Sequence, residues 1–238
     1  MGMLQIYNIL IYQPLFNLLV WLYTVIPGQD VGVAIVLLTI IVKIIFYPLS
    51  LQSIRSQKAL QTLQPKLDAL KKTHSDNKEA LARATMELYK TEKVNPLSSC
   101  LPLLIQLPVF IALYQVLRQG LGTTDFSALY PFVANPGALH TLSFGVLNLA
   151  APSIALAVLA GAAQFWQSKM LVHTRQPRVE GAKDESMTAI MNKQMLYVMP
   201  AMTVFIGWRL PAGLTLYWLV TTALTALQQL WMFRKKPA

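Results

Sequence analysis

Residues 31–50, VGVAIVLLTIIVKIIFYPLS, form an apolar run that carries a single lysine, Lys43. About 20 mostly apolar residues are what a membrane-spanning helix needs. At roughly 1.5 Å per residue, Lys43 would lie about 18 Å from Val31, just past the middle of the hydrocarbon layer. A charge at that depth costs about 2.5 to 3.5 kcal/mol unless it meets water or a partner. The run therefore predicts a span whose lysine is hydrated or paired.

Two interpretations of Lys43 remain open at this point. The long stem of a lysine allows its ammonium to reach the nearer membrane surface. Alternatively, Thr39 lies one turn earlier and Ser50 one heptad later on the same face, which favours a water-filled cavity beside this helix. The pair Tyr47-Pro48 interrupts the backbone pattern between Lys43 and Ser50.

The composition indicates a multi-span membrane protein with one domain in the lipid. Of its 238 residues, 55% are hydrophobic and only 13% are charged, and the mean hydropathy is +0.46. From the apolar runs we predict spans at 31–50, 97–117, 152–172, 195–210 and 214–233, a cytoplasmic helical hairpin at 51–96, an external loop at 118–151, a cytoplasmic loop at 173–194 and a basic tail at 234–238.

The first 30 residues are treated separately, as an N-terminal helix and turn. Residues 4–26 are apolar and long enough to span, but their interspersed polar side chains do not collect on one face. Whether this segment crosses the membrane or lies in its interface is left open by the residues themselves. Residues 27–30, Pro-Gly-Gln-Asp, make a turn before the next helix.

The basic residues fix an expected orientation. Residues 51–94 hold nine Lys or Arg against five acids, with leucines spaced by 3 and 4 on two arms, and this pattern predicts an antiparallel helical hairpin outside the membrane. Placing that hairpin in the cytoplasm puts 17 of the 20 basic residues on the same side. By the positive-inside rule, five spans then start outside and end in the cytoplasm.

The residues offer no signature of an enzyme, a metal site or a cofactor site. The three histidines lie far apart, and neither a GxSxG elbow nor a GxxxxGK[ST] loop occurs. All ten acids lie outside the predicted spans, which excludes a paired intramembrane aspartate protease. We therefore expect no enzymatic activity, no cofactor and no metal.

Polar side chains recur along the last predicted span. Tyr217, Thr221, Thr225 and Gln228 follow spacings of four, four and three and lie on one helical face, and Gln106 is placed in the middle of the second span. Such residues serve equally well as hydrogen-bonding contacts between helices or as the lining of a water-filled groove.

Three stretches carry a resemblance to a known family. YPLSLQSIRSQKALQTLQPKLDALKK, LYKTEKVNPLSSCLPLLIQLPVFIALYQVL and LPAGLTLYWLVTTALTALQQ resemble the YidC/Oxa/Alb family of membrane protein insertases, and the similarity covers residues 10–235. The resemblance implies an all-α polytopic protein whose five-helix transmembrane core encloses a hydrophilic groove, open to the cytoplasm and lipid. It also implies that residues 4–26 form an amphipathic helix in the outer interface and that the hairpin engages substrates.

The resemblance also implies particular site residues. The groove arginine of the family falls on Lys43 in VKIIFYPL, a departure that keeps the charge but loses the planar fork of a guanidinium. The other expected groove residues are Thr39, Gln106, Phe110, Tyr217 and Trp218, with Thr221 added from the polar face of the last span. The expected basic residues of the hairpin are Arg55, Lys58, Lys66, Lys71 and Lys72.

The function implied is insertion or chaperoning of nascent membrane proteins in the bacterial inner (plasma) membrane, without nucleotide hydrolysis. Nascent chains and membrane lipids are the expected partners, the Sec translocon and the ribosome are candidates, and DNA is not expected. A small-solute transporter or channel is the rival from another class, although we see no internal repeat of the kind such proteins carry. A purely chaperone role beside the translocon would use the same groove. Many bacterial members carry a large extracytoplasmic domain that these residues lack, which leaves open a natural short form or a truncation.

Overall fold

The computed structural model describes residues 2–74, 77–95, 101–120, 126–171 and 193–234, and most of them are helical. The expectation of a mostly helical fold is confirmed; in the described ranges, regular strands are limited to two pairs of residues. The elements in chain order are α1 (Met3–Tyr7), η1 (Asn8–Tyr12), α2 (Gln13–Val25), α3 (Val31–Ile45), α4 (Tyr47–Thr73), α5 (Lys78–Thr91), α6 (Leu101–Gly120), β1 (Leu142–Ser143), β2 (Leu147–Asn148), α7 (Ile154–Leu171), η3 (Gln194–Val198), α9 (Met199–Gly207) and α10 (Ala212–Arg234).

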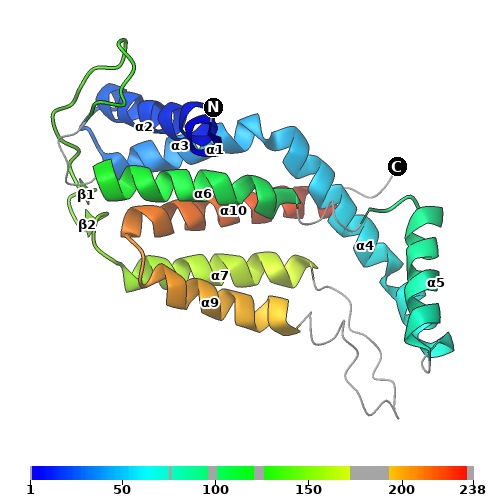
Figure 1. Cartoon of the computed structure of the whole chain (residues 1–238). Coiled ribbons are helices and arrows are strands. Elements are labelled where there is room, and N and C mark those ends of the chain that lie inside the picture. The colour runs from blue at the N-terminus through cyan, green and yellow to red at the C-terminus, as the bar shows by residue number, and fades with distance from the viewer. Residues whose placement is uncertain (1, 75–76, 96–100, 121–125, 172–192, 235–238) are drawn as a thin grey trace.

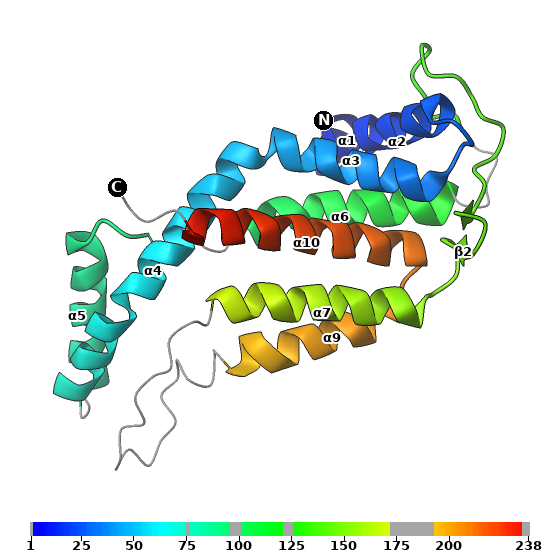
Figure 2. The ribbon, with the colours of Figure 1, turned by 180° about the vertical axis from the view of Figure 1, so that it is seen from behind.

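The long helices α3, α6, α7, α9 and α10 lie side by side, and α4 and α5 extend from one end of this bundle (Figure 1). The view from behind shows α10 between α6 and α7 (Figure 2). In agreement with that view, α10 packs against both α7 and α3, and α9 packs on the other side of α7.

The helix predicted over 31–50 is divided at Phe46, so that Ser50 lies on α4 and not on the same helix as Lys43. Proline has no N–H to donate to the carbonyl four residues earlier, and its ring clashes with that carbonyl. Pro48 accordingly occupies the first turn of α4, and α3 and α4 meet at a 70° bend. The sequence predicts an interruption at Tyr47-Pro48 within one helix. In the structure the interruption separates two helices.

Two π-helical turns have a related origin. The π-helices η1 and η3 each end two residues before a proline, Pro14 and Pro200. Because a proline cannot join the regular hydrogen-bond ladder, a widened turn in front of it lets the helix continue. The N-terminal segment therefore stays helical from Met3 to Val25.

By length and hydropathy alone, Leu4–Val25 is the one described helix able to cross a bilayer unaided, and α3 with α4 passes the same test as a bent pair. Residues Gln194–Gly207 form a shorter apolar helix. The number of spans, their sidedness and the role of residues 4–26 stay predictions. The connection between the last two helices lies at residues 208–211, earlier than the predicted 211–213, because α9 ends at Gly207 and α10 begins at Ala212.

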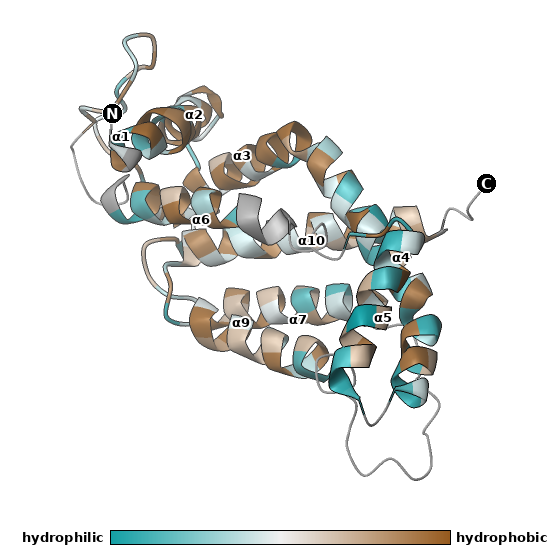
Figure 3. Ribbon diagram, turned by 45° about the vertical axis from the view of Figure 1, so that its right-hand side comes forward, coloured by the Kyte–Doolittle hydropathy of each residue, from teal (hydrophilic) through white to brown (hydrophobic). Residues whose placement is uncertain are grey.

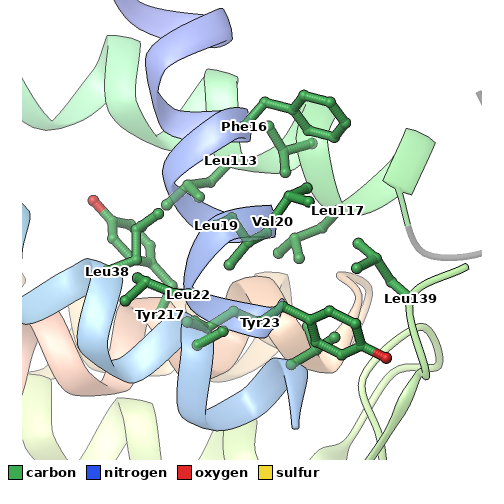
Figure 4. Packing of buried hydrophobic residues seen from close by; sticks show 14 of the residues in the cluster. Phe16, Leu19, Val20, Leu22, Tyr23, Leu38, Leu113, Leu117, Leu139 and Tyr217 are labelled. Carbon is green, nitrogen blue, oxygen red and sulfur yellow. The ribbon is translucent and has the colours of Figure 1, made fainter. Parts of the chain in front are cut away.

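The main core lies where α2 crosses α3, α6 and α10. Leu19 and Tyr23 of α2 are fully buried there, together with Leu38 of α3 and Leu113 of α6. Figure 4 shows these side chains meeting with Tyr217 of α10 on the far side. Each of these buried side chains makes many small van der Waals contacts, which together hold α2 on the bundle.

Two polar side chains attach the loop after α6 to the helices. Asn17 of α2 is buried; its Nδ2 donates to the carbonyl of Ala128 at 3.0 Å, and its Oδ1 accepts from the N–H of Tyr130 at 2.6 Å. Asp30 caps α3 by accepting from the N–H of Gly32 at 2.7 Å, and it also accepts from the hydroxyl of Ser143 and the N–H of Phe144.

These contacts determine the ionisation of Asp30. Burial on its own would raise the pKa of the Asp30 carboxyl, but hydrogen bonds from Ser143, Phe144, Val33 and Gly32 outweigh it and hold the pKa below its usual value. The charged form of Asp30 is therefore the form that joins the loop to the start of α3.

The hairpin of α4 and α5 is polar and solvated, as its charge predicts (Figure 3). Asn77 caps α5, with its Oδ1 accepting from the N–H of Glu79 at 3.1 Å and of Ala80 at 3.0 Å. Of the predicted cytoplasmic loop 173–194 only residues 193–194 fall within the described ranges, and residues 235–238 of the basic tail also lie outside them.

Candidate functional site

One cavity lies among α3, α4, α6 and α10. The cavity volume, counted as the space that the centres of water molecules can occupy, is about 40 Å³. A buried water needs about 10 to 15 Å³ by that measure, so the cavity has room for about three waters. It is lined by Thr39, Val42, Lys43, Phe46, Ser50, Gln106, Val109, Tyr217 and Thr221.

Lys43 is held at the wall of this cavity by α10. Its Nζ donates a hydrogen bond of 2.6 Å to Oγ1 of Thr225, and that hydroxyl donates in turn to the carbonyl of Thr221 at 2.7 Å. Thr225 therefore uses its hydroxyl proton on its own helix and presents a lone pair to the ammonium. Lys43 itself is partly buried, which agrees with a position between packing and solvent.

No carboxylate in the described part of the chain forms an ion pair with this ammonium. Within the described ranges the ion pairs are Lys66 with Glu92, Lys71 with Asp68, and Arg83 with Glu79, and all of them lie on α4 and α5 or directly after α5. The positive charge of Lys43 is thus compensated by hydroxyl and carbonyl dipoles and by whatever enters the cavity.

Hydrogen bonds on either side of Lys43 extend the polar character of the cavity. Gln106 of α6 donates through Nε2 to the hydroxyl of Tyr217, and Ser50 of α4 donates to Oε1 of Gln228 at 2.9 Å. The Nε2 of Gln228 is buried and has no partner within the described residues. Thr39 lines the cavity, but its hydroxyl donates to the carbonyl of Ile35 at 2.6 Å on its own helix.

Five of the seven predicted groove residues thus meet in one place: Thr39, Lys43, Gln106, Tyr217 and Thr221. Phe110 and Trp218 do not line the cavity; their rings meet edge to face, with centroids 5.7 Å apart. Sequence reasoning placed Thr225 on the right face but did not include it in the site. Which residues of α10 face α3 depends on the rotation of α10 about its axis. Spacing along one helix does not give that rotation.

The five predicted basic residues of the hairpin lie away from the cavity. Lys66 and Lys71 are in the ion pairs above, and Nζ of Lys58 lies 5.9 Å from the ring centroid of Phe233 on α10. Arg55 and Lys72 are exposed. Exposed pairs of this kind contribute about 0 to 1 kcal/mol each, so the hairpin's charge is available to partners more than it stabilises the fold.

Comparisons with known proteins show which proteins this chain is similar to. The family model described as 60Kd inner membrane protein matches residues 21–238. The chain is 37% identical over 204 residues to a membrane protein insertase YidC of Fusobacterium nucleatum, with 86% of each chain covered.

Two further relatives with the same name are much longer. The chain is 37% identical over 230 residues to the one of Legionella pneumophila, covering 94% of this chain and 36% of that protein. For the one of Ectopseudomonas mendocina the identity is 36% over 225 residues, covering 94% of this chain and 34% of that protein. The chain therefore spans most of the first relative and about a third of the other two.

Proposed function

The chain belongs to the YidC/Oxa/Alb family of membrane protein insertases, and from this premise we propose that it helps nascent membrane proteins enter the lipid bilayer along the cavity beside Lys43. The observation that carries the proposal is the position of Lys43. A partly buried ammonium, held by Thr225 and without a carboxylate partner in the described residues, faces a polar cavity with room for water.

The physical basis is a shorter path through the hydrocarbon. The transfer of an apolar helix into lipid lowers the free energy. The transfer of its polar flank across the membrane raises the free energy and therefore opposes insertion. Water and polar side chains inside the bilayer lower that barrier without nucleotide hydrolysis. The energy comes from the transfer of the substrate's own apolar residues into lipid.

The size of the cavity limits how it is used. An α-helix with its side chains is about 10 to 12 Å across, far wider than a space for about three waters. The substrate helix therefore stays in the lipid beside the cavity, and only its polar flank exchanges with the cavity's water. Lys43 favours acidic or uncharged flanks and disfavours basic ones.

The expected topology completes the proposal. Five spans, α3, α6, α7, α9 with η3, and α10, would cross the inner membrane, with residues 4–26 in the outer interface and the hairpin and C-terminus in the cytoplasm. The positive-inside count supports this orientation. The exposed basic residues of the hairpin would meet the nascent chain, and we propose the ribosome and the Sec translocon as further partners. The rival small-solute transporter is not favoured, because the relatives reported above are named insertases.

Insertion into proteoliposomes tests the proposal. Three single-span substrates that differ only in an acidic, neutral or basic translocated flank are added to vesicles containing the purified protein, and protease protection reports insertion. Lys43→Arg should keep insertion of all three, whereas Lys43→Glu should impair the acidic-flanked substrate most. Lys78→Glu, an equal charge change at an exposed position of α5, is the matched control. Insertion of the three substrates by the Lys43→Glu protein in the same proportions as by the wild type would defeat the electrostatic proposal.

A further inference from the structure

The loop after α6 carries a small hairpin whose outward side chains are apolar. β1 and β2 pair antiparallel, with Ser143 opposite Leu147. Ser143 is fully buried, whereas Leu142, Phe144 and Val146 are 52%, 70% and 85% exposed. A hairpin facing water normally turns its polar side chains outward. We refer to Leu142, Phe144 and Val146 as the hairpin tip.

The backbone of the tip is strained at Phe144, whose side chain is exposed on the surface. Phe144 and Gly145 both have positive φ, 51° and 72°. Such turns favour Asn and Gly at both central positions, and a bulky aromatic residue there is uncommon. The cost is offset by Asp30, whose Oδ2 accepts from the N–H of Phe144 at 2.6 Å. Strained residues that the surrounding structure holds in place often have a function.

The hairpin lies at the end of the bundle that carries interfacial residues. The N–H of Ala212 donates to the carbonyl of Ala151 at 2.9 Å, and the N–H of Gly213 donates to that of Leu149 at 3.0 Å. These bonds join the loop to the α9–α10 connection, where Trp208 and Arg209 are exposed. Aromatic and long basic residues of this kind gather at the headgroup level of membranes.

The part of the chain that carries the tip has no charged side chains of its own. From residue 126 to residue 168 the sequence holds no Asp, Glu, Lys or Arg. Further along the chain, Ile154 and Val158 of α7 are also exposed and apolar. A docking site for a protein would be expected to carry a polar rim with charged groups. An uncharged, apolar tip, followed in the chain by a helix with exposed apolar side chains, fits lipid instead.

We propose that the hairpin tip inserts into the boundary between headgroups and acyl chains of the leaflet at this end of the bundle, opposite to α4 and α5 (Figure 1). Through Asp30, the inserted tip fixes the height of the start of α3 in the membrane, and with it the depth of the helix that carries Lys43. The inference is independent of what the cavity does.

A fluorophore at the tip tests the contact with lipid. Cys100 is replaced by Ser, and an environment-sensitive dye is attached to Phe144→Cys in protein reconstituted into phosphatidylethanolamine and phosphatidylglycerol vesicles. We expect a blue-shifted emission, loss of quenching by aqueous iodide, and quenching by a nitroxide on the lipid acyl chain. Because Phe144 is exposed, the dye adds no volume to the core. Lys72→Cys, exposed on the polar hairpin of α4 and α5, gives the fully aqueous reference.

Two outcomes would overturn the proposal. Iodide quenching at position 144 equal to that at position 72 would place the tip in water. Shielding from iodide without quenching by the lipid nitroxide would show that protein, not lipid, covers the tip. A label at Val146 repeats the measurement on the opposite side of the turn, so that a local effect of one substitution does not decide the result.

Discussion

Lys43 and Thr225 lie 182 positions apart in the chain, and Nζ of the lysine donates a hydrogen bond of 2.6 Å to Oγ1 of the threonine. This bond joins α3 to α10 at the cavity and fixes where the ammonium points.

Thr225→Val should reduce discrimination between acidic and basic flanks of inserted substrates. Valine has a similar shape but cannot accept a hydrogen bond, and a bond to a charged group is worth about 1.5 to 3 kcal/mol. Without it the ammonium loses its fixed position at the cavity wall. Thr225→Ser keeps the acceptor and should preserve discrimination. The measurement is the ratio of insertion of acidic-flanked to basic-flanked substrates; an equal loss for both would point to a purely structural role.

Asp30→Asn should lower stability at neutral pH and have less effect in acid. The pKa of Asp30 in the folded protein lies below its ordinary value of 3.8, so its charged form stabilises the fold above about pH 4, and this contribution disappears as the pH falls through the folded-state pKa. Unfolding temperatures of wild type and variant in detergent should therefore converge below pH 4. A difference that persists unchanged into acid would show that the charge of Asp30 contributes nothing.

Asn17→Ala should destabilise the protein by about 1 to 3 kcal/mol, because it leaves buried backbone groups of the loop without partners. The groups affected are the carbonyl of Ala128 and the N–H of Tyr130. Denaturant unfolding followed by circular dichroism gives the change. Asn8→Ala, at an exposed position earlier in the same segment, is the control and should have little effect.

Gly161→Ala should disturb the contact between α7 and α9. A Cβ at this position would come within 2.4 Å of Cγ2 of Val204 and 3.1 Å of the carbonyl oxygen of Pro200. Overpacking of this kind costs about 1 to 3 kcal/mol. Adding Val204→Ala should restore part of the loss, which a double-mutant cycle of unfolding measures. Ala162→Leu, exposed on the same helix, should be tolerated; if the second substitution restores nothing, the contact is not the cause.

Much of the site was visible in the sequence because polar residues on apolar helices are few. Lys43 and Thr39 share a face by spacing, and Tyr217 and Thr221 share another. The family resemblance placed these residues together with Gln106, and the cavity contains all five. Phe110 and Trp218 follow the same resemblance but pack against each other, because side-chain volume and direction decide which residues reach a cavity.

What the sequence could not supply is the geometry between elements. The position of Thr225 opposite Lys43 depends on the rotation of α10, which a pattern within one helix does not contain. The strands β1 and β2 are too short to show an alternating pattern, and Phe144 stands where a turn residue would normally be expected. The sequence places Asp30 in a turn, whereas in the structure its carboxylate also holds a loop more than 100 residues away.

The helix break at Phe46 has an electrostatic consequence for the lysine three residues before it. Because Pro48 ends α3 early, Lys43 lies in the last turn of that helix, among carbonyl oxygens that carry the negative end of the helix dipole. Such a position favours a cation by about 0.3 to 1 kcal/mol, and more where solvent is partly excluded. In an unbroken helix the same lysine would face a neutral stretch of backbone. The proline that bends the chain therefore also places this ammonium beside the negative end of a helix.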